Sequence, residues 1–296
     1  MSPERDRRVT ALLALSQFPQ NATDLGRAVS AAMLGAPRIG AVSRTREKAA
    51  YDRIGTTYTV TRTPDSRIAR LIEGALADSV SVVNVGAGTG AYEPRDRRVV
   101  AIEPSETTVR QRPSSTAPAV IAYAESLPLC DDNVDAALAI LTVHHWADPI
   151  RGLSELRRVA RDRVVVFTCD PDSGVEFWLW EYLPTLGAVD RARLPPLSLY
   201  QEALGKLEVI PVAVPHDCTD GFLAAYWRRP EAYLSEVVRA NISTFSLLPV
   251  AAIEPGLARL ASDIDSGAWD ARFAHLREQE QLDVGYRLLV ANLKTH

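Results

Sequence analysis

The sequence predicts an α/β fold in which helices cover both faces of a doubly wound, mostly parallel sheet. Short apolar runs with the density of strands buried on both faces alternate with amphipathic helical segments. A glycine-rich turn follows the first of these runs, and 47% hydrophobic and 24% charged residues among 296 are typical of globular proteins. We expect seven strands, at 81–85, 98–102, 119–122, 134–141, 163–167, 207–214 and 286–293.

Two helices are predicted around these strands. Thr63 and Pro64 are typical of a helix start, with a capping hydroxyl and a proline at the first helical position. Apolar residues then recur at helical spacing up to Leu76. A second amphipathic helix follows the Asp148-Pro149 turn and precedes the fifth strand. Strands that alternate with helices in this way indicate a doubly wound sheet.

The chain divides into three segments by its pattern. Residues 1–45 have helical character and form an N-terminal extension. Residues 46–171 form the core that contains the glycine turn. Residues 172–296 contain helical insertions, at about 172–206 and 216–284, together with the last two sheet strands.

Composition disfavours several classes of function. The net charge of −4 argues against a nucleic-acid partner, because phosphate backbones select basic surfaces. Three scattered cysteines contain no Cys-x-x-Cys pair, which suggests neither a zinc knuckle nor a disulfide framework and fits a reducing, cytoplasmic compartment. No apolar run reaches the roughly 18–20 residues that span a bilayer, and the N-terminus is interpreted as a helix instead of an export signal.

The glycine turn indicates a nucleoside-containing cofactor. Strand 81–85 leads directly into Gly86-Ala87-Gly88-Thr89-Gly90. Glycines are needed where the chain turns with positive φ and where a ligand approaches backbone atoms. Doubly wound folds bind nucleotides at the end of the first strand, and an acid ending the second strand accepts hydrogen bonds from ribose hydroxyls. Glu103 occupies that second position.

The length of the turn distinguishes two kinds of cofactor. A dinucleotide's diphosphate needs a substantial helix whose N-terminus points at it. Eight residues separate Gly90 from Val99, where the next strand is under way, and Pro94 lies among them. This leaves little room for such a helix. The sequence therefore favours S-adenosylmethionine, which has no phosphate, over a nicotinamide or flavin, although Glu103 would serve either ligand.

These residues resemble the class I S-adenosylmethionine-dependent methyltransferases, in particular the type 11 branch that includes ubiquinone/menaquinone-type enzymes. The likeness covers about residues 51–170 and rests on four stretches, 82–90, 100–105, 122–135 and 137–146. It implies a Rossmann-like fold and S-adenosyl-L-methionine as the cofactor. Family members often have an acid at the position of Asn84 and an Asp at the position of Tyr123, so both positions depart from the pattern.

The resemblance also implies roles for individual residues. The turn residues Gly86, Ala87, Gly88 and Gly90 would pass under the methionine and ribose portions, and Glu103 would hold the ribose. The adenine would be flanked by Ala124 and Glu125, and the methionine end would be lined by Leu141 and Thr142. An N-terminal element would close over the cofactor through Tyr58 and Arg62. The guanidinium of Arg62 has the geometry to pair with the cofactor's carboxylate, and the alternative is a solvated charge.

Two histidines are candidates for a general base. Methyl transfer requires a base only when the acceptor must lose a proton. His144 and His145 come just after the fourth strand, and imidazole titrates near neutral pH. On an extended backbone adjacent side chains point oppositely, so we expect at most one to face the methyl group. The alternative is that both only cap the strand end.

A second polar cluster, 216–221, follows the strand that ends near Val214. His216 or Asp217 could orient or deprotonate the acceptor. These ligand types lie in one short stretch with no second motif, so we predict no metal. Tyr226, Trp227 and Tyr233 follow at helical spacing, and we favour a core role for them over an aromatic wall for a planar acceptor.

We therefore predict a methyltransferase that uses S-adenosylmethionine and acts on O, N or activated C of a small-molecule acceptor, with the insertions forming the acceptor pocket. The resemblance and the charge favour this hypothesis over three others. These are a non-catalytic S-adenosylmethionine-binding module, a nicotinamide-dependent oxidoreductase and a macromolecular methyltransferase. We expect no membrane partner, and the sequence leaves a homo-oligomer and the identity of the acceptor open.

Overall fold

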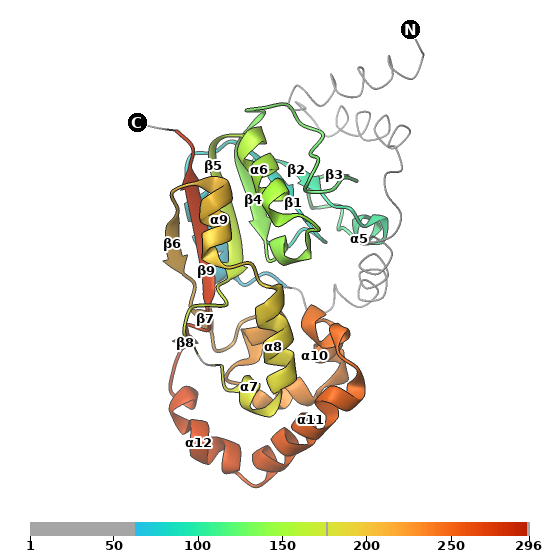
Figure 1. Cartoon of the computed structure of the whole chain (residues 1–296), viewed down its shortest axis with the longest axis vertical. Coiled ribbons are helices and arrows are strands. Elements are labelled where there is room, and N and C mark those ends of the chain that lie inside the picture. The colour runs from blue at the N-terminus through green and yellow to red at the C-terminus, as the bar shows by residue number, and fades with distance from the viewer. Residues whose placement is uncertain (1–62, 176, 295–296) are drawn as a thin grey trace.

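The computed structural model of the chain describes residues 63–175 and 177–294 (Figure 1). The N-terminal extension predicted at 1–45 lies outside the described residues, as do the predicted cofactor contacts of Tyr58 and Arg62. The glycine turn, the candidates His144, His145, His216 and Asp217, and all seven expected strands lie within them.

A seven-stranded sheet forms the centre of the fold, with strand order β3-β2-β1-β4-β5-β9-β6. Pairs among β1 to β5 are parallel, whereas β9 runs antiparallel to both β5 and β6. The predicted doubly wound, mostly parallel sheet of seven strands is therefore confirmed. The strands are β1 (Ser81–Val85), β2 (Arg98–Ile102), β3 (Ala119–Val120), β4 (Val134–Ile140), β5 (Ala160–Cys169), β6 (Glu208–Pro211) and β9 (Tyr286–Asn292).

One strand predicted from the sequence is divided in the structure. The apolar stretch expected as a single strand at 207–214 ends as β6 at Pro211. Two residues, β7 (Val214–Pro215), then pair with β8 (Gln281–Leu282) in a separate two-stranded sheet. Proline has no N–H with which to continue a ladder, so Pro211 and Pro215 limit both strands.

The first described helix, α4 (Ser66–Ala75), starts later than the sequence suggests. Its N-cap is Asp65, whose carboxylate accepts a hydrogen bond from the Arg67 N–H at 2.9 Å. The predicted start at Thr63 and Pro64 was therefore wrong. A side chain that is 2% exposed satisfies one of the free N–H groups of the first turn, which is why the helix begins after it.

Alternate residues of the central strands face two separate apolar cores. One core joins α4 to side chains such as Val82, Leu138 and Val165. The core on the opposite face joins α6 (Pro149–Val159) and α9 (Leu197–Leu204) to the strand residues next to these, including Val83 and Val164. Since every second residue of a strand faces the same side, a run apolar at both positions is buried on both faces.

The segments after β5 build a helical layer beyond the carboxyl ends of the parallel strands (Figure 1). The helical content predicted for the insertions is present. Trp227 and Tyr233 are 0% exposed, so the core role favoured for them is confirmed. The layer contains α7 (Leu179–Tyr182), α8 (Pro184–Arg193), α10 (Glu236–Ala240), α11 (Val250–Asp265) and α12 (Ala268–Arg277), with short 3-10 turns η3 (Leu223–Tyr226), η4 (Pro230–Leu234) and η5 (Ser243–Leu247). None of the described helices combines the length and apolar character needed to cross a membrane.

Candidate functional site

The glycine turn after β1 has one packed face and one open face. Gly86, Gly88 and Gly90 have φ of +69°, +52° and +94°, which glycine adopts without strain. A Cβ on Gly86 would lie 2.0 Å from Oγ1 of Thr142, in the loop after β4. A Cβ on Gly88 would meet nothing within 4 Å among the described residues. The first glycine therefore allows two loops to pack together, and the second faces space that no described residue occupies, of the kind a bound ligand would fill.

Glu103 holds this turn from the end of β2. Its side chain is 4% exposed, and its two carboxylate oxygens accept hydrogen bonds at 2.9 Å from the N–H groups of Gly88 and Ser105. Burial raises the pKa of this carboxyl, while the two N–H groups and the nearby Arg112 act in the opposite direction. Each carboxylate oxygen keeps a lone pair that can accept a hydroxyl hydrogen. Glu103 can therefore shape the turn and accept hydrogen bonds from a ribose at once.

A buried ion pair takes the place of a helix after the turn. No residue between 86 and 97 is helical, and all of them lie in the described part of the chain. Instead, Arg112 pairs with Glu93 at 2.6 Å and donates to the Gly88 carbonyl at 2.8 Å. Both charged side chains are 5% exposed. The turn is thus stiff but presents no helix N-terminus to a diphosphate, and it fits an adenosyl ligand without phosphate.

The loop after β4 contains a strained residue. Leu141 has φ of +49°, a conformation that costs a residue with a Cβ about 1–2 kcal/mol. Its N–H donates to the Phe167 carbonyl at 2.8 Å. Such strain tends to occur at ligand sites. Here it turns the chain away from the sheet and places Thr142 against Gly86, so the predicted methionine-end residues lie beside the glycine turn.

The segment predicted to flank adenine is tied to the loop after β4. Ala124 is 4% exposed and packs in the apolar core beneath β1 and β4. The Glu125 carboxylate accepts from the N–H groups of Ala147 and Asp148 at 2.8 and 3.2 Å. Glu125 therefore fixes the start of α6, and a role for this residue toward adenine stays a prediction.

The two histidines after β4 do not have the geometry that the sequence suggested. Val143–His145 forms a 3-10 turn, η2, and the two imidazole centroids are 4.0 Å apart. The expectation that the side chains point oppositely was wrong, because β4 has already ended at Ile140 and the backbone is no longer extended. Nδ1 of His145 lies 3.1 Å from a guanidinium nitrogen of Arg193. His145 thereby connects this turn to α8.

The second polar cluster is engaged in contacts away from the glycine turn. Asp217 is 59% exposed and pairs with Arg67 of α4 at 2.8 Å, and this contact lowers the pKa of Asp217. Nε2 of His216 lies 3.4 Å from a carboxylate oxygen of Glu280. These contacts join 216–217 to α4 and to the segment before β8. Among the described residues, no group of three or more His, Cys, Asp or Glu side chains is arranged to hold a metal ion.

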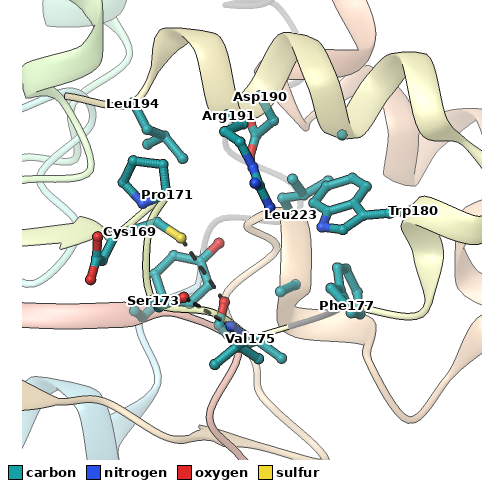
Figure 2. A pocket seen from close by; sticks show the side chains of 15 residues that line it. Cys169, Pro171, Ser173, Val175, Phe177, Trp180, Asp190, Arg191, Leu194 and Leu223 are labelled. Carbon is teal, nitrogen blue, oxygen red and sulfur yellow. Dashed lines mark hydrogen bonds between the residues drawn. The ribbon is translucent and has the colours of Figure 1, made fainter. Parts of the chain in front are cut away.

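A partly open cavity lies where β5 ends and β9 begins (Figure 2). Cys169 and Asp170 come from the end of β5, Tyr286 from β9, and α8 contributes Asp190 on the side opposite (Figure 2). None of His144, His145, His216 and Asp217 lines this cavity. The remaining lining residues are Pro171, Ser173, Val175, Phe177, Trp180, Gly187, Arg191, Leu194, Leu223, Ala224 and Val284.

Burial dominates the electrostatics of this cavity. It raises the pKa of Asp190, opposed by a hydrogen bond from the Thr244 hydroxyl at 2.6 Å and by the charge of Arg193. Burial also raises the pKa of the Cys169 thiol to about 12, and the negative charge of Asp190 adds to the effect. The insertions were expected to form an acceptor pocket, but none of these lining residues was predicted as a site residue, because the lining comes from separate segments with no shared motif. The aromatic residues near 177–182 were the one available signal.

Comparison with known proteins identifies a domain family and curated sequence relatives, and also a similar solved structure. The profile of the methyltransferase domain family matches residues 83–168. An uncharacterized methyltransferase of Mycobacterium tuberculosis strain H37Rv is 36% identical over 86 residues, which are 27% of this chain and 35% of that protein. Another, from Mycobacterium sp. strain JLS, is 33% identical over 122 residues, or 38% of this chain and 48% of that protein. The matches thus span less than half the length of these curated relatives.

A solved structure matches over a far larger share. It is a crystal structure from Anabaena variabilis ATCC 29413, described as a methyltransferase from an antibiotic biosynthesis pathway. It is 35% identical to this chain with a TM-score of 0.72, and the match covers 78% of this chain and 98% of that one. The likeness therefore extends well beyond the segment that the domain profile matches.

Proposed function

The chain belongs to the class I S-adenosylmethionine-dependent methyltransferases, and on that premise we propose that it methylates a small molecule held in the cavity at the end of β5. S-adenosylmethionine is the methyl donor of this family, and when bound it supplies a methyl group already activated on a sulfonium. The protein then has to position the acceptor and exclude water.

The donor side of the site is the surface made by the glycine turn and its neighbours. The open face of Gly88 offers room for the ligand, and Glu103 accepts the ribose hydroxyls. Leu141 and Thr142 bound the end nearest to β4. Ala124 and Glu125 are proposed to flank the adenine. The order β1-β4-β5 sets the direction of the donor, since its methyl end must point away from β2 and toward β5.

The observation that supports the proposal most is the place of the cavity relative to this turn. β5 is two strands from β1, and neighbouring strands are about 4.8 Å apart, so their carboxyl ends are roughly 10 Å apart. The cavity at the end of β5 is therefore within reach of a donor that extends from the turn across β4. Helices from the segment 172–296 cover it, and we propose that this segment is the acceptor-binding part of the chain.

A small acceptor fits the cavity better than a macromolecule does. The cavity is bounded on several sides and has aromatic walls at Phe177 and Trp180, and the chain's net charge is −4. The Anabaena relative is placed in an antibiotic biosynthesis pathway, and we propose a small organic acceptor here as well. The cysteines Cys130, Cys169 and Cys218 are all free, which supports a reducing location such as the cytoplasm.

The proposal is tested by incubating the protein with donor labelled on the methyl group and a panel of small hydroxyl, amino and activated-carbon compounds. Label recovered in a small product supports it. Calorimetry with S-adenosylhomocysteine measures the donor site separately. Binding without transfer to any acceptor would support a non-catalytic module, and preferential binding of a nicotinamide would refute the donor assignment.

The histidines are compared in the same assay through His144→Ala, His145→Ala and His216→Ala. We propose that His145 has the largest effect, because its contact with Arg193 fixes α8, which forms one wall of the cavity. If all three variants transfer at the wild-type rate, none of these histidines is the base.

A further inference from the structure

Two carboxyl groups line the cavity, and they have different tasks. Asp170 accepts from the Asp172 N–H at 3.1 Å, and its own N–H donates to the Gly285 carbonyl, so it closes the turn after β5. Asp190 lies on α8 and joins no backbone turn of this kind. Among the described residues, the Thr244 hydroxyl is the one hydrogen-bond donor to its carboxylate. Asp190 therefore has an acceptor oxygen left for a ligand.

The surroundings of Asp190 are suited to a flat apolar ring. Phe177 and Trp180 meet edge to face, with ring centroids 5.4 Å apart (Figure 2). The absence of a side chain at Gly187 lets the Trp180 indole pack on α8, since a Cβ there would lie 2.8 Å from Cδ2 of Trp180. Tyr286 adds a third aromatic ring to the lining. A half-buried carboxylate among aromatic walls favours a ligand that offers one polar hydrogen on an aromatic frame.

We propose that Asp190 is the acceptor-binding carboxylate and general base, and that the acceptor is a phenol whose hydroxyl donates to it. This inference rests on the proposed methyltransferase function and names its substrate class. In the step, the phenolic proton passes to the Asp190 carboxylate and the phenolic oxygen forms the new C–O bond. The C–S bond of the donor breaks, and its electron pair stays on sulfur.

The presence of a base favours a hydroxyl over an amine. A neutral arylamine attacks a methyl group with its own lone pair and can lose its proton afterwards, so it needs no base in the step. An alkylamine would pair with Asp190 as an ammonium, which has no lone pair for the attack. A phenol becomes a strong nucleophile as its proton leaves, so the half-buried carboxylate of Asp190 serves this acceptor best. Burial raises the pKa of Asp190, which makes it a better proton acceptor.

Three probes of one shape test the inference: p-cresol, p-toluidine and toluene. They carry a hydroxyl, an amino group and no polar hydrogen. Dissociation constants are measured by ligand-observed NMR on the full chain saturated with S-adenosylhomocysteine, and transfer is measured with labelled donor. We expect p-cresol to bind about tenfold or more tighter than toluene, because its hydroxyl can donate to the Asp190 oxygen that Thr244 leaves available, whereas toluene would cover that oxygen without a hydrogen bond. We also expect methyl transfer to p-cresol to be faster than transfer to p-toluidine, and no transfer to toluene.

Asp190→Asn removes the base with little change in volume, and we expect it to abolish transfer and to bring p-cresol within about twofold of toluene. The matched control is Glu202→Gln, the same change in charge on α9, which packs on the opposite face of the sheet. The melting temperature and the S-adenosylhomocysteine affinity of both variants show whether the fold and the donor site are intact.

Thr244→Val provides an independent test that keeps the Asp190 carboxylate and measures the pH dependence of transfer. The Thr244 hydroxyl lowers the pKa of Asp190, so its removal raises that pKa. The acid limb of the rate of transfer to p-cresol should move to higher pH, while Glu202→Gln leaves it in place. The other titratable or charged groups near Asp190 are Arg191 and Arg193 of α8, Cys169 of β5, Asp170 directly after that strand, and Tyr286 of β9.

The outcomes separate this inference from the function it rests on. Equal binding of p-cresol and toluene, transfer to p-toluidine instead of p-cresol, or an Asp190→Asn variant that still prefers p-cresol would each overturn the inference. If S-adenosylhomocysteine is bound and label reaches a different class of acceptor, the methyltransferase function stands and the phenol assignment fails. If S-adenosylhomocysteine does not bind, the donor site itself is refuted.

Discussion

Gly86 and Gly88 lie two residues apart in the same turn, yet alanine should act differently at the two positions. We expect Gly86→Ala mainly to reduce the stability of the fold and Gly88→Ala mainly to weaken ligand binding. Both residues have positive φ, so alanine costs about 1–2 kcal/mol of backbone strain at either site. Loss of chain entropy in the unfolded state returns about 0.4–1 kcal/mol. The conformational part of the change is therefore similar, and the surroundings decide the difference.

At Gly86 the new methyl group would overlap Thr142, with 2.0 Å to Oγ1. Overpacking of this kind costs about 1–3 kcal/mol. With the backbone strain, we expect Gly86→Ala to lower the free energy of unfolding by about 2–4 kcal/mol. At Gly88 the methyl group meets no described atom within 4 Å, and we expect a net loss of about 1 kcal/mol, or about 2–4 °C in melting temperature.

The affinity for the ligand should be reduced more by Gly88→Ala than by Gly86→Ala, although Gly86→Ala costs more stability. The space beside Gly88 is where we place the donor, so the Gly88→Ala methyl group would occupy ligand volume. An overlap of about 1–3 kcal/mol corresponds to roughly a 10–100-fold weaker S-adenosylhomocysteine affinity. The hydrogen bonds of Gly88 to Glu103 and from Arg112 involve backbone atoms and survive the change.

The assay combines thermal unfolding with calorimetry of S-adenosylhomocysteine on wild type, Gly86→Ala and Gly88→Ala. Thr142→Ala in the Gly86→Ala background removes the nearest clashing atom, and it should recover part of the lost stability. A Gly88→Ala protein that binds S-adenosylhomocysteine with wild-type affinity would show that the donor does not lie on the open face of the turn, and the reasoning about this site would be refuted.

Three further predictions concern carboxylates. Glu103→Gln keeps the shape of the side chain but replaces one accepting oxygen by an NH2 group, so the N–H of Gly88 or Ser105 loses its acceptor. Calorimetry should then show roughly 10–100-fold weaker S-adenosylhomocysteine binding. Replacing Arg112 by Met leaves Glu93 buried without its cation and should cost about 3–5 kcal/mol in urea unfolding, whereas a loss below about 1 kcal/mol would contradict a buried pair. The Arg67 side chain holds the pKa of Asp65 at about 2, below the ordinary 3.8, so Asp65 stabilises the fold above about pH 4 and this contribution is lost as pH falls toward 2. It is worth about 1–2 kcal/mol after allowance for the 42% exposure of Arg67, and acid unfolding of an Asp65→Asn variant should lack it; identical acid unfolding curves would disprove the assignment.

The sequence alone determined the features that depend on short, continuous stretches of chain. A strand buried on both faces is recognisable as an apolar run, and a turn with positive φ is recognisable from its glycines. The doubly wound sheet, the glycine turn at its first strand, and Glu103 at the end of the second strand followed from such local patterns. So did the absence of a helix between the turn and β2, because chain length limits what can fit there.

The tertiary structure decided everything that required distant side chains to meet. Glu93 and Arg112 are 19 residues apart and no pattern relates them, yet they form the buried support of the turn. Asp190 is one of many acids in the sequence until α8 packs near the end of β5 and partly withdraws it from water. Local spacing fixes backbone conformation, whereas the desolvation that gives a carboxylate its chemistry arises only when separate segments pack against one another.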